Sequence, residues 1–456
     1  MFTKFKKISL LSLSLSILLT SAYAQKKPLF DGKTLNGWKA VGGKAPYSIE
    51  DGMIVGTMKA GTPNSFLITE KEYGNFILEL DVKLEGLTTN SGIQTRSHYD
   101  PTGNKGNGLV FGRQMEIDPS ERAWTGGIYD EARRLWLYPL ELNTAAKSAY
   151  KVEAFNHYKI ECIGNETKTW VNGVPVAYVV DTLDQAGIIG LQVHGIGNNN
   201  KLEGKKVYFK NITIQTENLK PQAFPKADYV VNLTPNALSA QEKSNGYKLL
   251  FDGKTSAGWI GAKTGSFPKK GWDISNGLIS VLPSDGAEST NGGDIVTTEQ
   301  FSAFDLSFEF KLTEGANSGV KYFVTLAEQT SGSAIGLEFQ VLDDEKHPDA
   351  KLGINGNRTI ASLYDLITSK KILNCIKPIG AWNKGRIVVY PNNKVEHYLN
   401  GIKVLEYTRG SEEFRKLVAG SKYKDWKNFG EAPKGRILLQ DHGNKVNFRS
   451  IKIKTL

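Results

Sequence analysis

The chain has 456 residues and a formal net charge of +10 at pH 7, from 57 lysines and arginines against 47 aspartates and glutamates. Its basic residues are dispersed among acidic ones and form no stripe, which argues against nucleic-acid binding. The sequence contains two cysteines. We expect Cys162 and Cys375 to be unpaired core thiols, because an exported protein that relied on disulfides would carry more than one cysteine per domain.

The N-terminus predicts export. Three lysines precede an apolar run from Ile8 to Leu19, and the small residues of Ser21 to Ala24 follow. This order is typical of a secretory signal peptide, and the run is shorter than the ~20 residues that span a bilayer. We predict a signal peptide at residues 1–24, cleaved near Ala24 and Gln25, and a periplasmic or extracellular protein whose mature chain has no transmembrane segment. A membrane tether is the alternative.

The remaining chain is an internal duplication. The sequence from Leu29 to Thr34, followed by Gly37-Trp38, recurs from Leu250 to Thr255, followed by Gly258-Trp259. Four further matches keep the same order: Asn90-Ser91-Gly92 with Asn317-Ser318-Gly319, Ile128-Tyr129-Asp130 with Leu363-Tyr364-Asp365, Trp170 to Val174 with Tyr398 to Ile402, and Leu191 to Gly195 with Leu439 to Gly443. We therefore predict two domains, at residues 26–216 and 246–456. A proline-containing linker at residues 217–245 joins them and ends in a short helix.

Both copies have the pattern of β-strands. Residues 76–84 and 304–312 alternate apolar and polar side chains, as half-buried strands do. Asn172-Gly173 and Asn400-Gly401 each separate two apolar runs, which is a strong hairpin signal. Helical patterns are short, near residues 237–244 and 412–418. The predicted fold class is all-β, with two tandem β-sandwich (jelly-roll) domains.

Taken together, these motifs resemble the 3-keto-disaccharide hydrolase domain family. The resemblance implies a concanavalin A-like jelly roll in each copy and a carbohydrate substrate that has been oxidised at C3. The second copy is closer to the family pattern, with Glu338-Phe339-Gln340, His347-Pro348-Asp349-Ala350 and Gln440-Asp441-His442-Gly443. In the first copy, Gln114-Met115-Glu116-Ile117-Asp118 replaces the Glu-x-Gln strand and Val193 replaces Asp441. Either the residues shared by both copies carry one chemistry, or one copy only binds sugar.

A row of polar side chains on one strand of each copy predicts a sugar-binding groove. Alternate residues of a strand project from one face, so Gln114, Glu116 and Asp118 lie together. Glu338 and Gln340 form the row of the second copy, with Asp343 and His347 just beyond its end. A solvated outer face is the alternative interpretation.

A second pair of polar residues recurs near the end of each copy. Gln192 and His194 share a face of their strand, as do Gln440 and His442, whereas Asp441 points the other way unless a bulge turns it. The histidines are candidates for general acid/base catalysis or metal binding, and a structural role is the alternative.

A loop rich in aromatic and charged residues, from Trp124 to Trp136, suggests further sugar contacts in the first copy. Its candidates are Tyr129, Asp130, Glu131 and Arg134, and Tyr364 repeats Tyr129 in the second copy. Arg96 and His98, which follow the Asn-Ser-Gly strand, are expected to join this group. The alternative is scattered surface charge around two core tryptophans.

The implied chemistry removes the C2 proton next to the C3 ketone, expels the C1 substituent, and adds water. The catalytic candidates are Glu116, His194, Glu338 and His442. A divalent metal is compatible with these residues, although no ligand spacing demonstrates one and no cofactor is certain.

Two other functions remain open. One is a tandem carbohydrate-binding module without turnover. The other is a laminarinase-like glycoside hydrolase, because Glu116-Ile117-Asp118-Pro119-Ser120-Glu121 resembles the catalytic strand of that class. Strand parity places Glu121 on the face opposite Glu116, and the second copy does not repeat the pattern.

Overall fold

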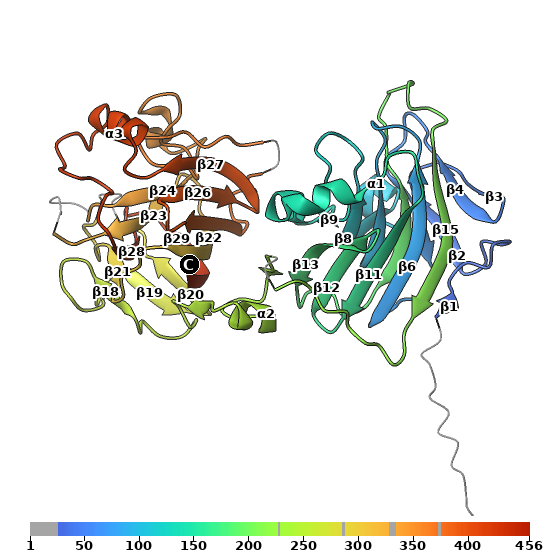
Figure 1. Cartoon of the computed structure of the whole chain (residues 1–456), viewed down its shortest axis with the longest axis horizontal. Coiled ribbons are helices and arrows are strands. Elements are labelled where there is room, and N and C mark those ends of the chain that lie inside the picture. The colour runs from blue at the N-terminus through green and yellow to red at the C-terminus, as the bar shows by residue number, and fades with distance from the viewer. Residues whose placement is uncertain (1–25, 227–228, 285–287, 328–333, 373–374) are drawn as a thin grey trace, which may run out of the picture.

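The computed structural model describes residues 26–226, 229–284, 288–327, 334–372 and 375–456. Two β-sandwiches lie side by side along the long axis of the molecule (Figure 1). The predicted signal peptide lies outside the described residues and stays a prediction. Within the described ranges, no helix combines the length and the apolar character that crossing a membrane requires.

The first domain consists of two packed antiparallel sheets. The nine-stranded sheet has the order β16-β13-β12-β11-β6-β15-β4-β3, with β1 also paired to β15. Its strands are β1 (Lys27–Pro28), β3 (Tyr47–Glu50), β4 (Met53–Thr57), β6 (Phe76–Leu84), β11 (Asn156–Ile163), β12 (Glu166–Val171), β13 (Val174–Val180), β15 (Lys206–Gln215) and β16 (Val231–Asn232), the last added in parallel. The seven-stranded sheet has the order β10-β9-β8-β7-β14-β5-β2. It contains β2 (Trp38–Gly42), β5 (Ser65–Thr69), β7 (Ser91–Asp100), β8 (Leu109–Ile117), β9 (Ile128–Glu131), β10 (Leu135–Tyr138) and β14 (Ile188–Val193).

The second domain repeats this plan. Its eight-stranded sheet has the order β19-β20-β29-β22-β25-β26-β27, with β17 paired to β29, and its five-stranded sheet has the order β18-β21-β28-β23-β24. The strands are β17 (Lys248–Leu249), β18 (Trp259–Gly261), β19 (Trp272–Ser275), β20 (Leu278–Val281), β21 (Ile295–Thr297), β22 (Phe304–Leu312), β23 (Asn317–Val324), β24 (Leu337–Leu342), β25 (Asn383–Val389), β26 (Lys394–Leu399), β27 (Ile402–Thr408), β28 (Arg436–Leu439) and β29 (Val446–Thr455). The all-β prediction with two tandem sandwiches is confirmed.

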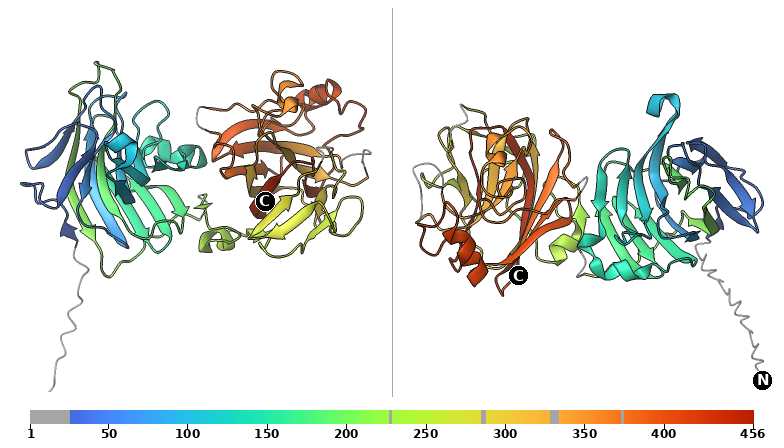
Figure 2. Two further views of the ribbon diagram at one scale, coloured as in Figure 1. Left: turned by 180° about the vertical axis from the view of Figure 1, so that it is seen from behind. Right: turned by 90° about the horizontal axis from the view of Figure 1, so that it is seen from above.

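Helices are few and short. They are α1 (Gly103–Gly106), α2 (Ala240–Ser244) and α3 (Glu412–Ala419), with 3-10 turns η1 (Leu140–Leu142), η2 (Thr144–Ala149) and η3 (Pro348–Lys351). Helices α2 and α3 fall where short helices were expected. Turned views show the two sheets of each sandwich packed face to face (Figure 2).

The alternation of side chains explains the packing of each sandwich. In β6, Leu78, Leu80 and Val82 are fully buried in the core, whereas Glu79 and Asp81 face outward. The hairpins form as predicted, because Asn172 and Gly173 (φ 50° and 80°) and Asn400 and Gly401 (φ 51° and 84°) adopt the left-handed conformation that this type of turn requires. Both cysteines are free and buried, as expected.

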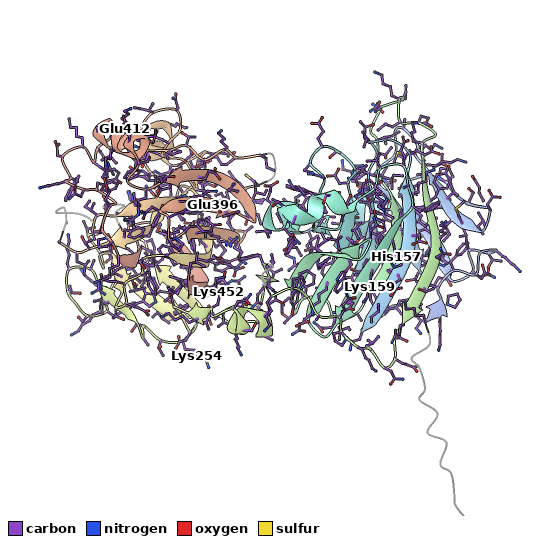
Figure 3. All side chains as sticks on the ribbon, viewed as in Figure 1. His157, Lys159, Lys254, Glu396, Glu412 and Lys452 are labelled. Atoms are coloured by element: carbon purple, nitrogen blue, oxygen red, sulfur yellow. The ribbon has the colours of Figure 1, made fainter. Side chains whose placement is uncertain are left out.

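The segment between the domains contacts both of them. β16 pairs with β13 of the first domain. The side chain of Ser239 caps α2, and Glu242 of this helix forms an ion pair with Lys452 on β29 of the second domain. Lys452 is labelled in Figure 3. The linker therefore makes specific contacts with both domains.

Candidate functional site

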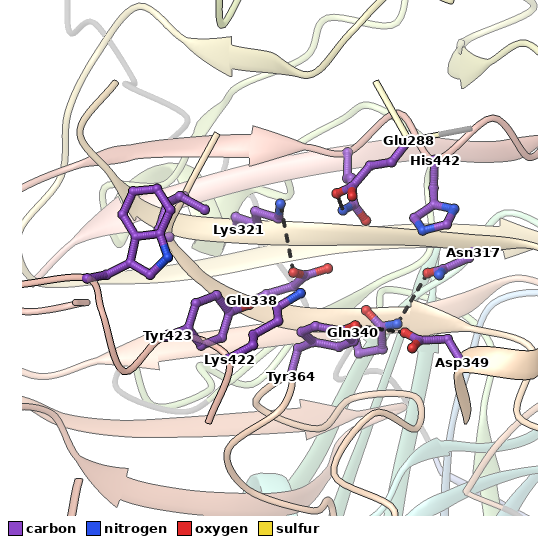
Figure 4. Close-up of a pocket in the computed structure, with 14 residues that line it drawn as sticks. Glu288, Asn317, Lys321, Glu338, Gln340, Asp349, Tyr364, Lys422, Tyr423 and His442 are labelled. Atoms are coloured by element: carbon purple, nitrogen blue, oxygen red, sulfur yellow. Dashed lines mark hydrogen bonds and ion pairs between the residues drawn. The ribbon is translucent and has the colours of Figure 1, made fainter. Parts of the chain in front are cut away.

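A cavity of ≈ 200 Å³ lies against the five-stranded sheet of the second domain (Figure 4). Leu337, Phe339 and Val341 of β24 enter the core, so Glu338 and Gln340 project from the opposite face. That face is covered by the segments that follow β24 and α3. The cavity is lined by Glu288, Asn317, Lys321, Ile335, Gly336, Glu338, Gln340, Asp349, Tyr364, Lys422, Tyr423, Trp426, Gln440 and His442.

Glu338 is the buried carboxylate of the cavity. Its exposed fraction is 4%, and burial raises its pKa to about 7 although the charge of Lys321 opposes that shift. Lys321 is its cross-strand neighbour on β23, with Nζ 3.9 Å from Glu338 Oε2. The carboxylates around Lys321 outweigh its burial and hold its pKa above the usual value. The pair thus places a base that titrates near neutrality beside a fixed positive charge.

Lys422 brings a second cation to the cavity (Figure 4). Its Nζ lies 4.3 Å from the centre of the Tyr364 ring, and burial lowers its pKa although the charge of Glu338 opposes the change. The Tyr364 hydroxyl donates to Asp349 Oδ2 at 2.9 Å, and Arg358 Nη1 donates to Asp349 Oδ1 at 2.8 Å. Tyr364 is therefore held in place while its ring contacts the ammonium group.

Gln440 and His442 approach the cavity from the end of β28. Gln440 Nε2 donates to Glu288 Oε1 at 2.8 Å. Gln440 Oε1 and His442 Nδ1 are buried without a hydrogen-bond partner in the described part of the chain. Buried polar atoms are nearly always paired, so these two atoms are available to a bound molecule.

The described residues contain no group of three or more His, Cys, Asp or Glu side chains arranged around a metal position. The rings of His347 and His442 lie 5.6 Å apart, and His347 Nδ1 accepts a hydrogen bond from the backbone of Asp349. His347 therefore lies at the edge of the cavity, where its ring adjoins His442.

Strand register aligns the two domains residue by residue. Gly92 pairs with Glu116, and Gly319 pairs with Gln340. Glu116 therefore occupies the position of Gln340, and Gln114 occupies the position of Glu338. The carboxylate and the amide have exchanged places, so Glu116 and Glu338, which are both catalytic candidates, do not occupy equivalent positions.

The same register confirms other equivalences. Gln114 pairs with Tyr129, and Glu338 accepts a backbone hydrogen bond from Tyr364, so the two tyrosines correspond. The hydroxyls of Ser91 and Ser318 donate to the backbone oxygens of Gln192 and Gln440, at 2.7 and 2.8 Å. Gln192 thus corresponds to Gln440, and His194, two residues later, to His442.

The direct hydrogen-bond partners of the Glu116 carboxylate are neutral amides. Asn90 Nδ2 donates to one of its oxygens at 2.8 Å and Gln114 Nε2 to the other at 2.9 Å. Burial raises its pKa to about 7. Gln94 takes the place of Lys321 and donates to Gln114 at 2.7 Å. Burial also lowers the pKa of His194. The first domain thus has a neutral amide at the position of Lys321.

Three predicted sugar ligands have structural roles instead. A bulge in β7 gives Arg96 a φ of 48° and buries it completely, with its guanidinium on the backbone oxygens of Gly74 and Gly164. Asp343 accepts hydrogen bonds from the backbone of residues 315, 345 and 346. Asp441 accepts hydrogen bonds from the backbone of residues 292, 293 and 443. These three side chains already form hydrogen bonds with backbone groups of neighbouring loops, so they serve the structure and not sugar binding.

The charged loop of the first domain is likewise an ion-pair cluster. Asp130 is fully buried and pairs with Arg133 and Arg134, and Arg134 also pairs with Asp181. Of the predicted loop residues, Tyr129 and Glu131 remain on the outer face of the sheet, because they alternate with Asp130 on β9.

The laminarinase-like motif does not lie on one strand. β8 ends at Ile117, so Glu121 is in the following turn, where it is exposed. Asp118 pairs with Arg122 at 2.8 Å. Glu116 and Glu121 therefore do not form the facing pair of carboxylates that a retaining glycosidase requires.

Sequence reasoning missed the two lysines of the cavity. Lys321 could have been found by parity, because it lies two residues after Gly319 and is the only charged residue of its strand. Lys422, Tyr423 and Trp426 come from residues 409–435, whereas residues 181–187 make the corresponding connection in the first domain. The longer connection in the second domain was the sequence signal that could have drawn attention to these residues.

The comparisons with known proteins agree with this organisation. The model of the 3-keto-alpha-glucoside-1,2-lyase-like domain matches residues 25–215 and again residues 246–454. The chain belongs to this family. A 3-keto-disaccharide hydrolase of Bacteroides thetaiotaomicron is 37% identical over 242 residues, which cover 48% of this chain and 82% of that protein.

Solved structures from Parabacteroides distasonis ATCC 8503 are also similar. One, described as a glycosyl hydrolase candidate, is 31% identical to this protein with a TM-score of 0.43. The match covers 49% of this protein and 100% of the solved chain. A second with the same description is 25% identical with a TM-score of 0.36 and covers 46% and 100%.

Proposed function

We propose that this protein is an exported enzyme that cleaves 3-keto-glycosides in the cavity of its second domain. The observation that carries the proposal is Glu338, a buried carboxylate with a pKa of about 7, which lies 3.9 Å from Lys321 in a cavity that also contains Lys422. Family membership and the name of the Bacteroides relative support the substrate class.

The reaction begins with proton transfer. A C3 ketone acidifies the proton on C2, so the Glu338 carboxylate takes that proton and the C2–H electron pair becomes an enolate. General bases are most effective when their pKa is near the working pH. The enolate oxygen carries the negative charge, and the ammonium group of Lys422 or Lys321 stabilises it electrostatically.

The enolate then expels the substituent at C1. Its electron pair forms the C1–C2 double bond, the C3 ketone re-forms, and the C1–O bond breaks. The departing oxygen takes a proton, for which His442 is the candidate donor, because it lines the cavity and its Nδ1 has no hydrogen-bond partner among the described residues. Water then adds its hydroxyl to C1 and its proton to C2, which gives net hydrolysis.

The first domain lacks the base and the cation that these reaction steps use in the second domain. Gln114 and Gln94 replace Glu338 and Lys321, and an amide does not take a proton near neutral pH. We therefore assign turnover to the second domain.

The experiment compares an aryl glucoside with its 3-keto form, with and without chelator, and follows release of the aglycone. We expect release from the 3-keto form, its loss in Glu338→Gln, and its retention in Glu345→Gln, which changes an exposed carboxylate of the same domain. Comparable release from the unoxidised glucoside would contradict the proposal and favour a conventional glycosidase. Absence of release from both would favour a binding module. Loss of release with chelator would reveal a metal requirement.

A further inference from the structure

The first domain contains a groove that the proposed reaction does not use. Its volume is ≈ 410 Å³, about twice that of the second-domain cavity at ≈ 200 Å³. The lining residues are Gly42, Thr62, Pro63, Asn64, Phe66, Asn104, Gly108, Leu109, Val110, Glu131, Gly195 and Gly197. Most of them belong to β5, β8 and β9 or to the loops at their ends, on the seven-stranded sheet. A groove of this size has room for more than one sugar ring.

Two planar polar side chains are fixed together in this groove. Asn64 Nδ2 donates to Glu131 Oε1 at 3.0 Å, and the backbone N–H of Gly195 donates to Asn64 Oδ1 at 2.8 Å. Burial, followed by the charge of Asp130, raises the pKa of Glu131. Carboxyl and amide groups held in this way can donate to and accept from adjacent hydroxyls, which suits a sugar.

The rest of the lining is apolar or backbone. Leu109 is partly exposed and provides apolar surface for the C–H face of a sugar ring, whereas Phe66 and Val110 are 3% and 2% exposed. The lining residues include no lysine or arginine, in contrast to the second-domain cavity with Lys321 and Lys422. An anionic ligand would meet the Glu131 carboxyl without a compensating cation, so the groove favours an uncharged ligand.

A buried amide lies next to the groove without lining it. Gln192 pairs in register with Phe66 on the neighbouring strand, so both side chains lie on the same face of the sheet. Gln192 is fully buried, and neither its amide oxygen nor its amide nitrogen has a hydrogen-bond partner among the described residues. Polar atoms in this state are rare unless something else satisfies them.

We infer that the first domain carries a second carbohydrate site, in which Asn64, Glu131 and Leu109 bind an uncharged di- or oligosaccharide without cleaving it. The inference goes beyond the proposed function, because it concerns unoxidised sugar and requires no turnover. The first domain would hold a glycan near the second domain, which acts on oxidised glycosides.

The test is isothermal titration calorimetry on the full mature chain with maltose, cellobiose, trehalose and sucrose, and with glucose and glucuronic acid for comparison. At least one disaccharide should bind, and at least tenfold more tightly than glucose or glucuronic acid. Asn64→Ala and Glu131→Ala should each weaken that binding at least tenfold. Glu72→Gln, which changes an exposed carboxylate of the same domain, should not. Thermal melts establish that each variant is folded, and two variants guard against the misfolding of one.

Three results would overturn the inference: no binding of any of the four disaccharides, binding that both groove variants retain, or binding that Glu338→Gln abolishes, since this last would place the sugar in the second domain. Release of aglycone from a 3-keto-glucoside, measured on the same samples, reports separately on the proposed function.

Discussion

At the scale of single residues, Glu116 and Glu338 have the same burial and differ in their neighbours. Burial raises the pKa of each to about 7. Two neutral amides surround Glu116, whereas Glu338 has the ammonium group of Lys321 3.9 Å away. A reaction that creates negative charge needs that cation, because a buried anion without a partner is costly. The proposed reaction therefore depends on Glu338 and Lys321 together and not on a buried carboxylate alone.

The first prediction removes the proposed base. Glu338→Gln keeps the size of the side chain but cannot take a proton, so we expect kcat/KM on a 3-keto-glucoside to fall by on the order of 10²–10⁴-fold. The matched change Glu116→Gln in the first domain should lower it by less than tenfold. Steady-state assays of both variants decide the matter, and equal losses would contradict the assignment to the second domain.

The second prediction concerns pH. Glu338 must be ionised to act as a base, and its pKa is about 7, so kcat/KM should rise with pH up to about 7 and then level off. The charge of Lys321 lowers that pKa, so Lys321→Met should move the rise to higher pH. A pH profile of each protein measures the shift. A rise that stays in place in Lys321→Met would show that another group controls it.

At the scale of secondary-structure elements, the two Asn-Gly hairpins have the same conformation and different surroundings. Gly173 has a φ of 80°, and a Cβ added there would meet no atom within 4 Å. Gly401 has a φ of 84°, and a Cβ there would lie 3.0 Å from Pro139 of the first domain. A side chain at position 173 therefore has open space, whereas position 401 forms part of the contact between the domains.

The third prediction uses this difference. Gly173→Ala forces an L-residue into the left-handed region and should reduce the free energy of unfolding by about 1–2 kcal/mol. Gly401→Ala should cost more, because the new Cβ also presses on Pro139 and Leu142. Urea denaturation followed by tryptophan fluorescence compares them. Equal losses in the free energy of unfolding would mean that the contact between the domains adjusts to the new Cβ without loss of stability.

At the scale of the whole molecule, the linker ties the domains together through a buried ion pair. Glu242 of α2 receives hydrogen bonds from Asn232 and from its own helix cap, and it pairs with Lys452 of the second domain. The cations and donors around Glu242 hold its pKa below the usual value in spite of burial. The Glu242 carboxylate therefore contributes stability that is present above the ordinary glutamate pKa and is lost as the pH falls through its own lowered pKa, whereas burial lowers the pKa of Lys452 and works against the pair.

The fourth prediction breaks this tie. Lys452→Met leaves Glu242 charged, buried and without its cation, so we expect the free energy of unfolding to fall by about 3–5 kcal/mol at neutral pH. The double change Glu242→Gln with Lys452→Met removes both charges and should recover part of the loss. Denaturation curves of the three proteins test this, and a single variant as stable as the wild type would contradict it.

The sequence alone determined the features that depend on short segments. Repeated motifs showed two domains, the alternation of Phe76 to Leu84 predicted a half-buried strand, and Asn-Gly predicted both hairpins, because these patterns act through neighbouring residues. Parity within a strand also grouped Gln192 with His194 and Gln440 with His442. Only the tertiary structure showed that Glu116 stands opposite Gly92 where Gln340 stands opposite Gly319, since register depends on the partner strand. It also brought Lys422 to Glu338 and turned Arg96 inward at a bulge, because contacts between distant segments depend on how the whole chain packs.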